Sequence, residues 1–147
     1  MATPHVSGSV ALIKQAHPDW SANQIKAAIK NSAKNINDLV FAQGRGRLDV
    51  LGVVKQPTPP PIAELEPIST IGFERAIKGK IFTNNLKFWS ISYVYFNYAP
   101  ETGWVELYRS STLPADSVLY TVRTTTFMDG PYIIRLLVED AEGRQAV

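Results

Sequence analysis

Cysteine is absent from the 147-residue chain, and histidine occurs only twice, as His5 and His17. Without cysteine, the chain has no disulfide framework, no thiol nucleophile and no cysteine-based zinc site. The spacing of the two histidines makes them a poor pair of metal ligands. We therefore expect neither a metal ion nor a cofactor.

Long apolar runs and blocks of like charge are also absent. No stretch reaches the roughly 18 apolar residues of a membrane span, and no basic segment followed by an apolar one marks a secretory signal. The formal net charge is +2 and the basic residues are scattered, so nucleic acid is not an expected partner. The content of apolar residues (45%) and charged residues (19%) is typical of one globular domain or two small ones.

The first part of the chain has the periodicity of a helix. One face is formed by Val6, Val10, Ile13 and Ala16, at the spacing of helical turns. No charged residue occurs from Ala2 to Ile13, and a helix that is apolar or small on all sides belongs in a protein interior. Because Pro4 is tolerated only in a first turn, the helix is predicted to begin close to the N-terminus.

A second helix is predicted after a break at His17 and Pro18, because a residue before proline disfavours the helical region. Ser21 and Gln24 have the spacing of a capping box. The inward stripe of this helix is predicted to contain Ile25, Ala28 and Ile29.

A boundary follows the helical part. Gly44 and Gly46 predict a tight turn before a short element from Leu48 to Val54. Residues 56–61 contain four prolines, which favour a stiff, extended spacer. We therefore divide the chain into a helical part at 1–55, a proline-rich linker at 56–61 and a second part at 62–147.

From Ile62 onward the apolar residues alternate with a period of two, which is typical of half-buried strands. About six short strands are expected, near residues 62–68, 75–82, 88–96, 104–108, 118–124 and 132–139. Asp129 and Gly130 form the turn before the last of them. The expected fold class is α+β, with an antiparallel β-sandwich of immunoglobulin or fibronectin type as the second part.

Three groups of residues could carry chemistry or binding. His5 and Ser9 share a helix face, but a catalytic triad needs an exposed nucleophile and partners from other elements, so a packed or hydrogen-bonded His5 is the preferred interpretation. A weak calcium site is conceivable at acidic residues that flank turns, but a turn-forming role is preferred; these residues are Asp129, Asp140 and Glu142.

The aromatic residues of the second part could line a binding face for a sugar or a peptide. They are Trp89, Tyr93, Tyr95, Phe96, Tyr98, Trp104 and Tyr108. Sandwich core and cross-strand pairs are the preferred interpretation for most of them. Phe88 and Phe96, on the face opposite Trp89, are the best candidates for an exposed patch.

The opening "MATPHVSGSVALIKQAHPDWSANQIKAAIKNSAKN" resembles the segment directly after the catalytic serine in subtilisin-like serine proteases. The signature of that family reads Gly-Thr-Ser-Met-Ala-Thr-Pro-His-Val followed by small residues, and this chain supplies it from Met1 to Gly8. The resemblance continues through Pro18 and Trp20 to "GRGRLDV" and covers about Met1 to Lys55. Residues Ile71 to Gly143 resemble, more loosely, β-sandwich modules that follow such proteases. A further strand usually follows the last turn in that pattern, so we expect this module to be truncated at its last strand.

The resemblance implies a helix that carries the nucleophile at its N-terminus and packs against a parallel sheet. The serine would immediately precede Met1, and the other catalytic residues would lie upstream, so no catalytic residue of the family falls within this sequence. By their place in the motif, the residues adjacent to the catalytic site are Met1, Ala2, Thr3, Pro4 and His5.

The expected function is therefore that of the C-terminal part of a subtilisin-like endopeptidase, extracellular or at the cell surface, which cleaves proteins or peptides. Its helical part is expected to need a sheet that is not encoded here. This chain alone is expected to be inactive. The alternative is a non-catalytic sandwich that binds a glycan, a cell surface or a protein, or that serves as a spacer.

Overall fold

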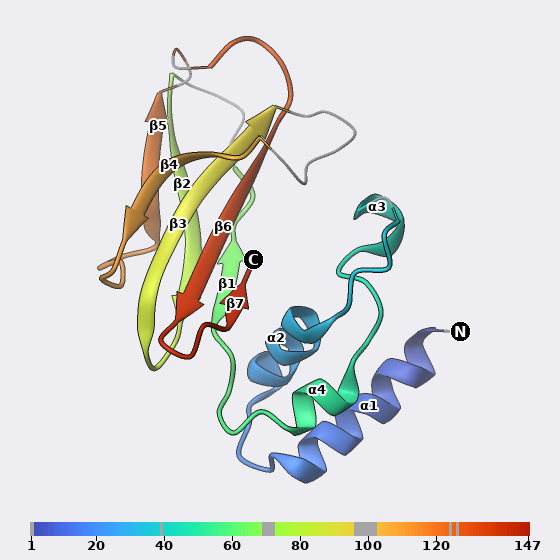
Figure 1. The fold of residues 1–147 in the computed structure, drawn as a ribbon. Helices are drawn as coiled ribbons and strands as arrows, with labels where there is room; N and C mark the ends of the chain where they lie inside the picture. The colour runs from blue at the N-terminus through green and yellow to red at the C-terminus, as the bar shows by residue number, and fades with distance from the viewer. Residues whose placement is uncertain (1, 39, 69–72, 96–102, 124, 126) are drawn as a thin grey trace. The chain divides into compact units, whose positions relative to one another are not determined.

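The computed structural model describes residues 2–38, 40–68, 73–95, 103–123, 125 and 127–147 (Figure 1). The chain divides into two compact units, residues 1–60 and residues 61–147. The division lies inside the proline-rich stretch that the sequence marks as a linker. Each unit has a hydrophobic core of its own, and each is described separately below.

The first unit is helical. Its elements are α1 (Ala2–Ala16), α2 (Ala22–Ser32), α3 (Val40–Gln43) and α4 (Val50–Val54). Helix α1 ends directly before His17 and Pro18, as predicted. The capping box at the start of α2 is also confirmed: the Gln24 N–H donates to Ser21 Oγ at 3.3 Å, and the Ser21 N–H donates to Gln24 Oε1 at 2.7 Å.

The core of the helical unit is small. Its buried members are Ile13, Trp20, Ile25, Ala28 and Val53. The inward positions predicted for α2 are confirmed, since Ile25 and Ala28 are buried and Ile29 packs against them.

Helix α1 contributes little to this core. Of the face predicted for it, only Ile13 is buried, whereas Val6 and Val10 are 43% and 36% exposed. The neighbouring Leu12 is 56% exposed. A helix with no charged residue before Lys14 and this much exposed apolar surface is consistent with the expectation that α1 is only partly covered by this chain.

The predicted turn at Gly44 and Gly46 is present and joins two distant backbone segments. Lys34 and Arg47 exchange backbone hydrogen bonds of 2.8 Å. Gly46 has a φ of 104°, and a Cβ there would collide with the carbonyl oxygen of Lys34. Glycine is therefore required at this position both by its backbone conformation and by the close approach of the other segment.

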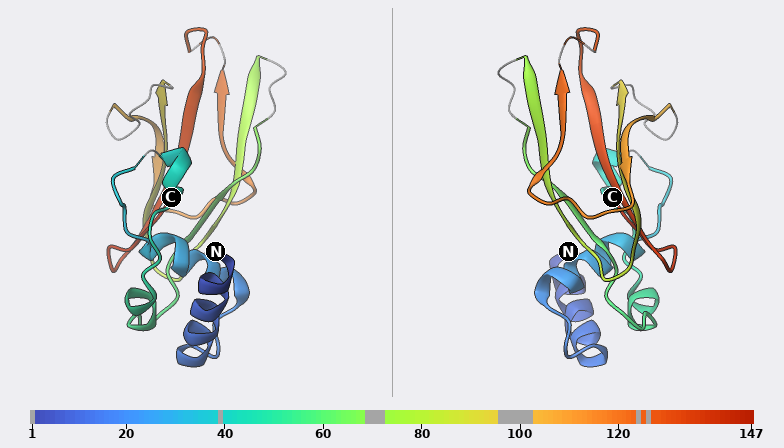
Figure 2. Two further views of the ribbon diagram at one scale, coloured as in Figure 1. Left: turned by 90° about the vertical axis from the view of Figure 1, so that its right-hand side faces the viewer. Right: turned by 90° about the vertical axis from the view of Figure 1, so that its left-hand side faces the viewer.

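The second unit consists of two antiparallel sheets (Figure 2). One sheet has the order β1-β2-β5, and the other has the order β4-β3-β6-β7. The strands are β1 (Ile62–Leu65), β2 (Glu74–Phe82), β3 (Leu86–Tyr95), β4 (Val105–Ser110), β5 (Val118–Arg123), β6 (Tyr132–Asp140) and β7 (Gln145–Ala146). The α+β class and the antiparallel strands are confirmed. The short β7 pairs with β6 through Val138 and Ala146.

The core of this unit contains side chains from both sheets. Ile77 of β2 and Val122 of β5 meet Ile91 of β3 and Val138 of β6 in one buried cluster. The inward face predicted for β3 is confirmed at Trp89 and Ile91, which are both buried. This arrangement, with apolar residues of two sheets facing each other, is consistent with a β-sandwich, and the second unit is called the sandwich below.

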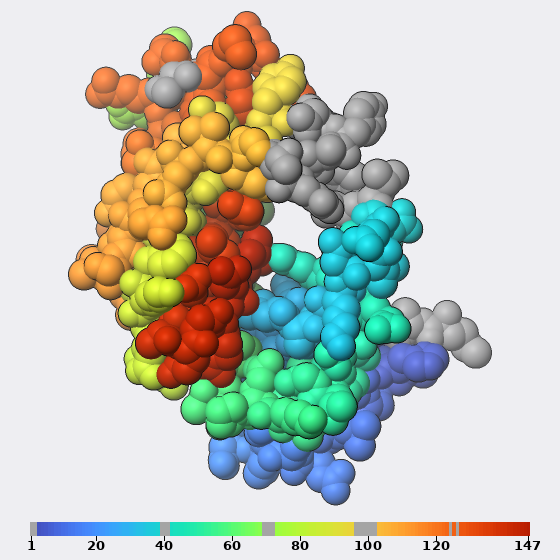
Figure 3. All heavy atoms as spheres, in the orientation of Figure 1, coloured from blue at the N-terminus to red at the C-terminus, as the bar shows by residue number. Residues whose placement is uncertain are grey.

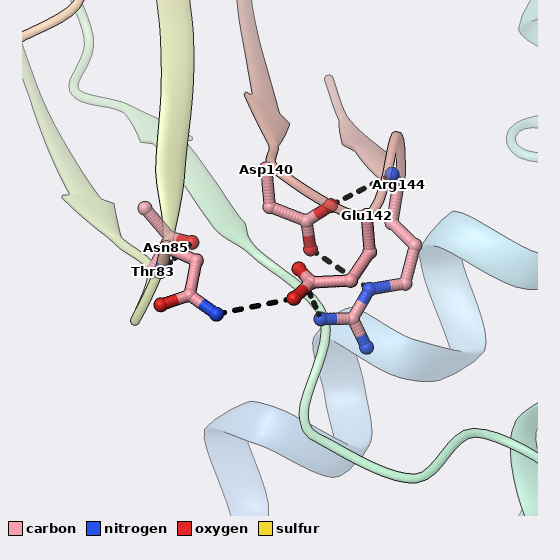
Figure 4. A network of polar contacts seen from close by, with 5 residues as sticks. All are labelled: Thr83, Asn85, Asp140, Glu142 and Arg144. Carbon is pink, nitrogen blue, oxygen red and sulfur yellow. Dashed lines mark hydrogen bonds and ion pairs between the residues drawn. The ribbon is translucent and has the colours of Figure 1, made fainter.

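A buried carboxylate fixes the turn between β6 and β7 (Figure 4). Asp140 is only 1% exposed, and its Oδ1 accepts the Arg144 backbone N–H while its Oδ2 accepts Arg144 Nε–H, both at 2.8 Å. The same turn is attached to the start of β3, because Ala141 donates its N–H to the Asn85 carbonyl at 2.8 Å and Asn85 Nδ2 donates to Glu142 Oε1 at 3.1 Å. In Figure 3 the red chain end accordingly lies beside the yellow-green start of β3.

Replacing this carboxylate tests its contribution to stability. In Asp140→Asn the amide nitrogen cannot accept a hydrogen bond from Arg144, so a charge-assisted bond at a buried position is lost. We expect the free energy of unfolding of the sandwich to fall by about 1–3 kcal/mol. The measurement is urea denaturation followed by NMR signals of β3 and β6.

The matched control is Asp129→Asn, because Asp129 is an exposed aspartate in a turn of the same unit. Its effect should lie within about 0.5 kcal/mol. Equal urea midpoints for Asp140→Asn and the control would show that the buried carboxylate does not stabilise the turn.

Candidate functional site

The residues that the subtilisin-like motif places beside the catalytic site lie at the start of α1. Thr3, Pro4 and His5 occupy the first turns of the helix and are exposed, whereas Met1 lies outside the described residues. The first turn contains no acidic residue. Backbone N–H groups at a helix start have no partner within the helix and attract negative charge, so this end of α1 is suited to stand beside an anionic centre.

Neither described histidine forms part of a catalytic triad. Ser9 is buried, and its Oγ donates to the His5 carbonyl oxygen at 2.6 Å, one turn back along α1. His17 stacks on Trp20 with a centroid distance of 4.0 Å, and its Nε2 lies 3.1 Å from the Val54 carbonyl oxygen. These contacts are structural. The bond from Ser9 goes to the backbone of His5, so the preferred interpretation of a packed or hydrogen-bonded His5 side chain stays a prediction.

The acidic residues considered for calcium have structural contacts. Both carboxylate oxygens of Asp140 accept hydrogen bonds from Arg144, and Glu142 contacts Asn85 and Arg144. Asp129 lies in a different turn. Within the described ranges, no group of three or more acidic or histidine side chains could hold a metal ion, and no helix is long and apolar enough to cross a membrane.

Phe88, one of the two residues of the predicted aromatic patch, lies on the face of β3 that points away from the sandwich core. Phe88 is half-buried, and the guanidinium carbon of Arg109 lies 4.1 Å from the centre of its ring. Arg135 lies at the same distance over the ring of Trp104. Phe96 lies outside the described residues. The face of the Phe88 ring is thus already occupied by a cation, an arrangement that is itself favourable.

A β-bulge in β4 positions Arg109 over this ring. Ile91 pairs with Tyr108, but the next residue of β3, Ser92, pairs with Glu106, so Leu107 is the additional residue. In a regular strand, residues three apart point to opposite faces. The bulge brings Glu106 and Arg109 to the same face, where Arg109 Nη2 donates to Glu106 Oε2 at 2.7 Å and Nε lies 3.0 Å from the same oxygen.

Several other aromatic residues of the second unit form the core and cross-strand pairs that were the preferred interpretation. Trp89 is buried, and its Nε1 donates to the Thr112 carbonyl oxygen at 2.7 Å. Its ring lies 5.2 Å from that of Tyr108, which lies 5.6 Å from that of Tyr120. Tyr98 lies outside the described residues. Sequence reasoning missed both the bulge and the stacking of Arg109, because an extra residue in a strand leaves no compositional mark.

Comparison with known proteins identifies the helical unit. Residues 1–46 match the model of the subtilase family. The chain is 48% identical over 61 residues to the minor extracellular protease Vpr of Bacillus subtilis (strain 168), a match that covers 37% of this chain and 8% of that protein.

Two further relatives give the same result. The alkaline elastase YaB of a Bacillus species is 51% identical over 45 residues, which are 30% of this chain and 12% of the relative. The subtilisin-like protease SBT4.14 of Arabidopsis thaliana is 46% identical over 54 residues, which are 33% and 7%. No solved structure matches the chain. The helical unit therefore contains a segment that is similar to subtilisin-like proteases, and the chain spans only a small part of the length of these relatives.

The carboxylates of the sandwich give its stability a predictable dependence on pH. Hydrogen bonds from Arg109, Lys87 and Asn85 lower the pKa values of Glu106, Glu139 and Glu142, respectively. Because the folded pKa lies below the unfolded value, the stabilisation is present above about pH 4.5 and is lost as the pH falls through the folded values. We expect a lower urea midpoint for the sandwich at pH 3.5 than at pH 7.

The variant Glu106→Gln removes one of these carboxylates and should make the pH dependence shallower. Adding salt at pH 7 should also reduce the difference, because both side chains of the Glu106–Arg109 ion pair are exposed. A urea midpoint that stays constant between pH 7 and pH 3.5 would contradict the assignment.

Proposed function

We propose that this chain is the C-terminal part of a subtilisin-like serine endopeptidase that hydrolyses proteins or peptides outside the cell. The match of residues 1–46 to the subtilase family carries this proposal, and the name of the Bacillus subtilis relative as an extracellular protease supports the location. The reaction would be transfer of an acyl group from a peptide to a serine, followed by hydrolysis of the acyl-enzyme.

In this proposal α1 supports the nucleophile at its first turn. The N–H groups and the positive dipole end of the helix would stabilise the negative charge that develops on the carbonyl oxygen of the substrate. Met1, Ala2, Thr3, Pro4 and His5 would support the site without taking part in the reaction.

The side chains of α1 support the idea that a further layer covers this helix. The exposed apolar residues Val6 and Leu12 lie on a helix without charge as far as Ile13. Gly8 is also informative, because a Cβ there would have no atom within 4 Å. Within this chain, a larger residue at position 8 would therefore meet no steric obstacle. Glycine would be needed there if another element approached the backbone of α1 closely.

A graft tests the proposal. Residues 2–46 replace the corresponding segment of the Vpr protease, and hydrolysis of casein is measured with and without a serine-directed inhibitor. We expect the graft to be secreted and to hydrolyse casein in an inhibitor-sensitive way, because the segment retains the packing surfaces of the family. The 147-residue chain alone should show no hydrolysis.

The matched control is the same graft with its nucleophilic serine changed to alanine, which should be inactive. A graft that is secreted and folded but inactive would contradict the proposed role of α1. Inhibitor-sensitive hydrolysis by the 147-residue chain alone would contradict the proposal that it is inactive.

We also propose that residues 61–147 form an immunoglobulin-like or fibronectin-like module that binds a glycan, a cell surface or a protein, or that acts as a spacer. Its own core and its compact, separate unit support this. Phe88 and Phe96 are the candidate contact residues. Because Arg109 lies over the Phe88 ring, a ligand that stacks on this ring would have to displace Arg109 or stack on the guanidinium itself.

A further inference from the structure

A cavity of about 340 Å³ opens at one end of the sandwich unit, at the end of β3 and the start of β6. Val122 of β5 lines it from one sheet, and Tyr93 of β3 and Ile134 of β6 line it from the other. The volume is at the lower end of the range for small-molecule sites, which is roughly 300–1,000 Å³. The cavity is therefore large enough for one bulky side chain or a small organic acid.

Aromatic rings hold one wall of this cavity in place. Phe127 meets Tyr93 edge to face with a centroid distance of 4.8 Å and an interplanar angle of 85°, and its ring lies 5.1 Å from that of Tyr132. The Tyr132 hydroxyl donates to the Met128 carbonyl oxygen at 3.1 Å. The wall presents apolar ring surface at fixed positions, which suits an apolar group of the ligand.

The cationic group of the cavity comes from the inner face of the other sheet. Arg75 is two residues before the buried Ile77 on β2 and pairs with Val122 of β5. It therefore lies on the face of the strand that points between the sheets, and it lines the cavity with its Nε buried. Arg75 is half-buried, and its planar fork of N–H groups matches the geometry of a carboxylate.

The remaining lining narrows the class of ligand. The walls are mostly aliphatic or aromatic, so the hydroxyl groups of a sugar would find few hydrogen-bonding partners there. Asp129, at an exposed position of the lining, would repel any anion, but a ligand with one negative charge less strongly than a polyanion. A single carboxylate attached to an apolar body satisfies both conditions.

We propose that this cavity binds an apolar carboxylic acid, such as the C-terminal residue of a peptide that ends in a large apolar side chain. The carboxylate lies against the Arg75 guanidinium, and the side chain lies among Tyr93, Phe127 and Ile134. This inference deepens the proposal that the sandwich is a binding module; it uses neither Phe88 nor Phe96, and it does not depend on peptidase activity.

The test uses the 147-residue chain and pairs of ligands that differ only in charge. N-acetyl-phenylalanine and N-acetyl-phenylalanine amide are titrated and followed by NMR shifts of the methyl groups of Val122 and Ile134. We expect the acid to bind at least about tenfold more tightly than the amide. A peptide that ends in phenylalanine and its amidated form are titrated in the same way, and they show whether a free acid or a peptide terminus is the better ligand.

Arg75→Gln should reduce the affinity for the acid at least about tenfold and should leave the weak binding of the amide unchanged. Arg123→Gln is the matched control, because Arg123 is an exposed arginine on β5 that pairs with Glu74; its affinity should equal that of the unchanged chain. If Arg75→Gln does not fold, the comparison of acid and amide on the unchanged chain still decides the question.

Three results would overturn the inference: equal binding of acid and amide, binding that shifts residues outside the cavity, and no binding of any of the four ligands at millimolar concentration. Each of them concerns this cavity alone. The peptidase proposal is decided separately by the casein assay of the graft.

Discussion

The exposed apolar surface of α1 is the physical constraint on which the interpretation of this chain depends. The helix carries no charge from Ala2 to Ile13, yet among the side chains described there, from Thr3 to Ile13, only Ser9 and Ile13 are buried. Such a composition is favourable only where another layer excludes water, because apolar side chains gain free energy in proportion to the area they bury. The proposed origin in a subtilisin-like protease would provide a physical reason for it, since the resemblance implies a helix that packs on a sheet and carries the nucleophile at its N-terminus.

The sandwich unit buries its apolar residues within itself, whereas the helical unit leaves apolar residues of α1 exposed. Its two sheets bury apolar residues against each other, and Asp140 fixes the final turn from a buried position. Apolar rings outside its core are also covered, because Arg109 lies over the ring of Phe88 and Arg135 lies over the ring of Trp104. Ser90 of β3 is 1% exposed. A unit of this kind can be attached to an enzyme without sharing its core, which fits a binding or spacer role.

Features that depend on local sequence could be predicted, and features that depend on long-range packing could not. The spacing of Ser21 and Gln24 predicts the capping box, and the alternation of residues around Trp89 predicts β3. Both features depend on residues that are close together in the sequence. The bulge at Leu107 depends on the pairing of β3 with β4, so the pairing of Arg109 with Glu106 could not be foreseen. The position of Arg75, two residues before Ile77, indicates that it lies on an inward face of its strand. That it lines a cavity depends on how the two sheets pack, which the sequence does not show.

The most direct test of this account is amide hydrogen exchange of the 147-residue chain, resolved by residue. Few buried contacts should let α1 open more often than the core strands, so its amides from Val6 to Ala16 should exchange at least about tenfold faster than those of β3 and β6. Uniformly slow exchange from Val6 to Ile29, equal to that of the sandwich core, would show that this chain covers the helix by itself and would contradict the account.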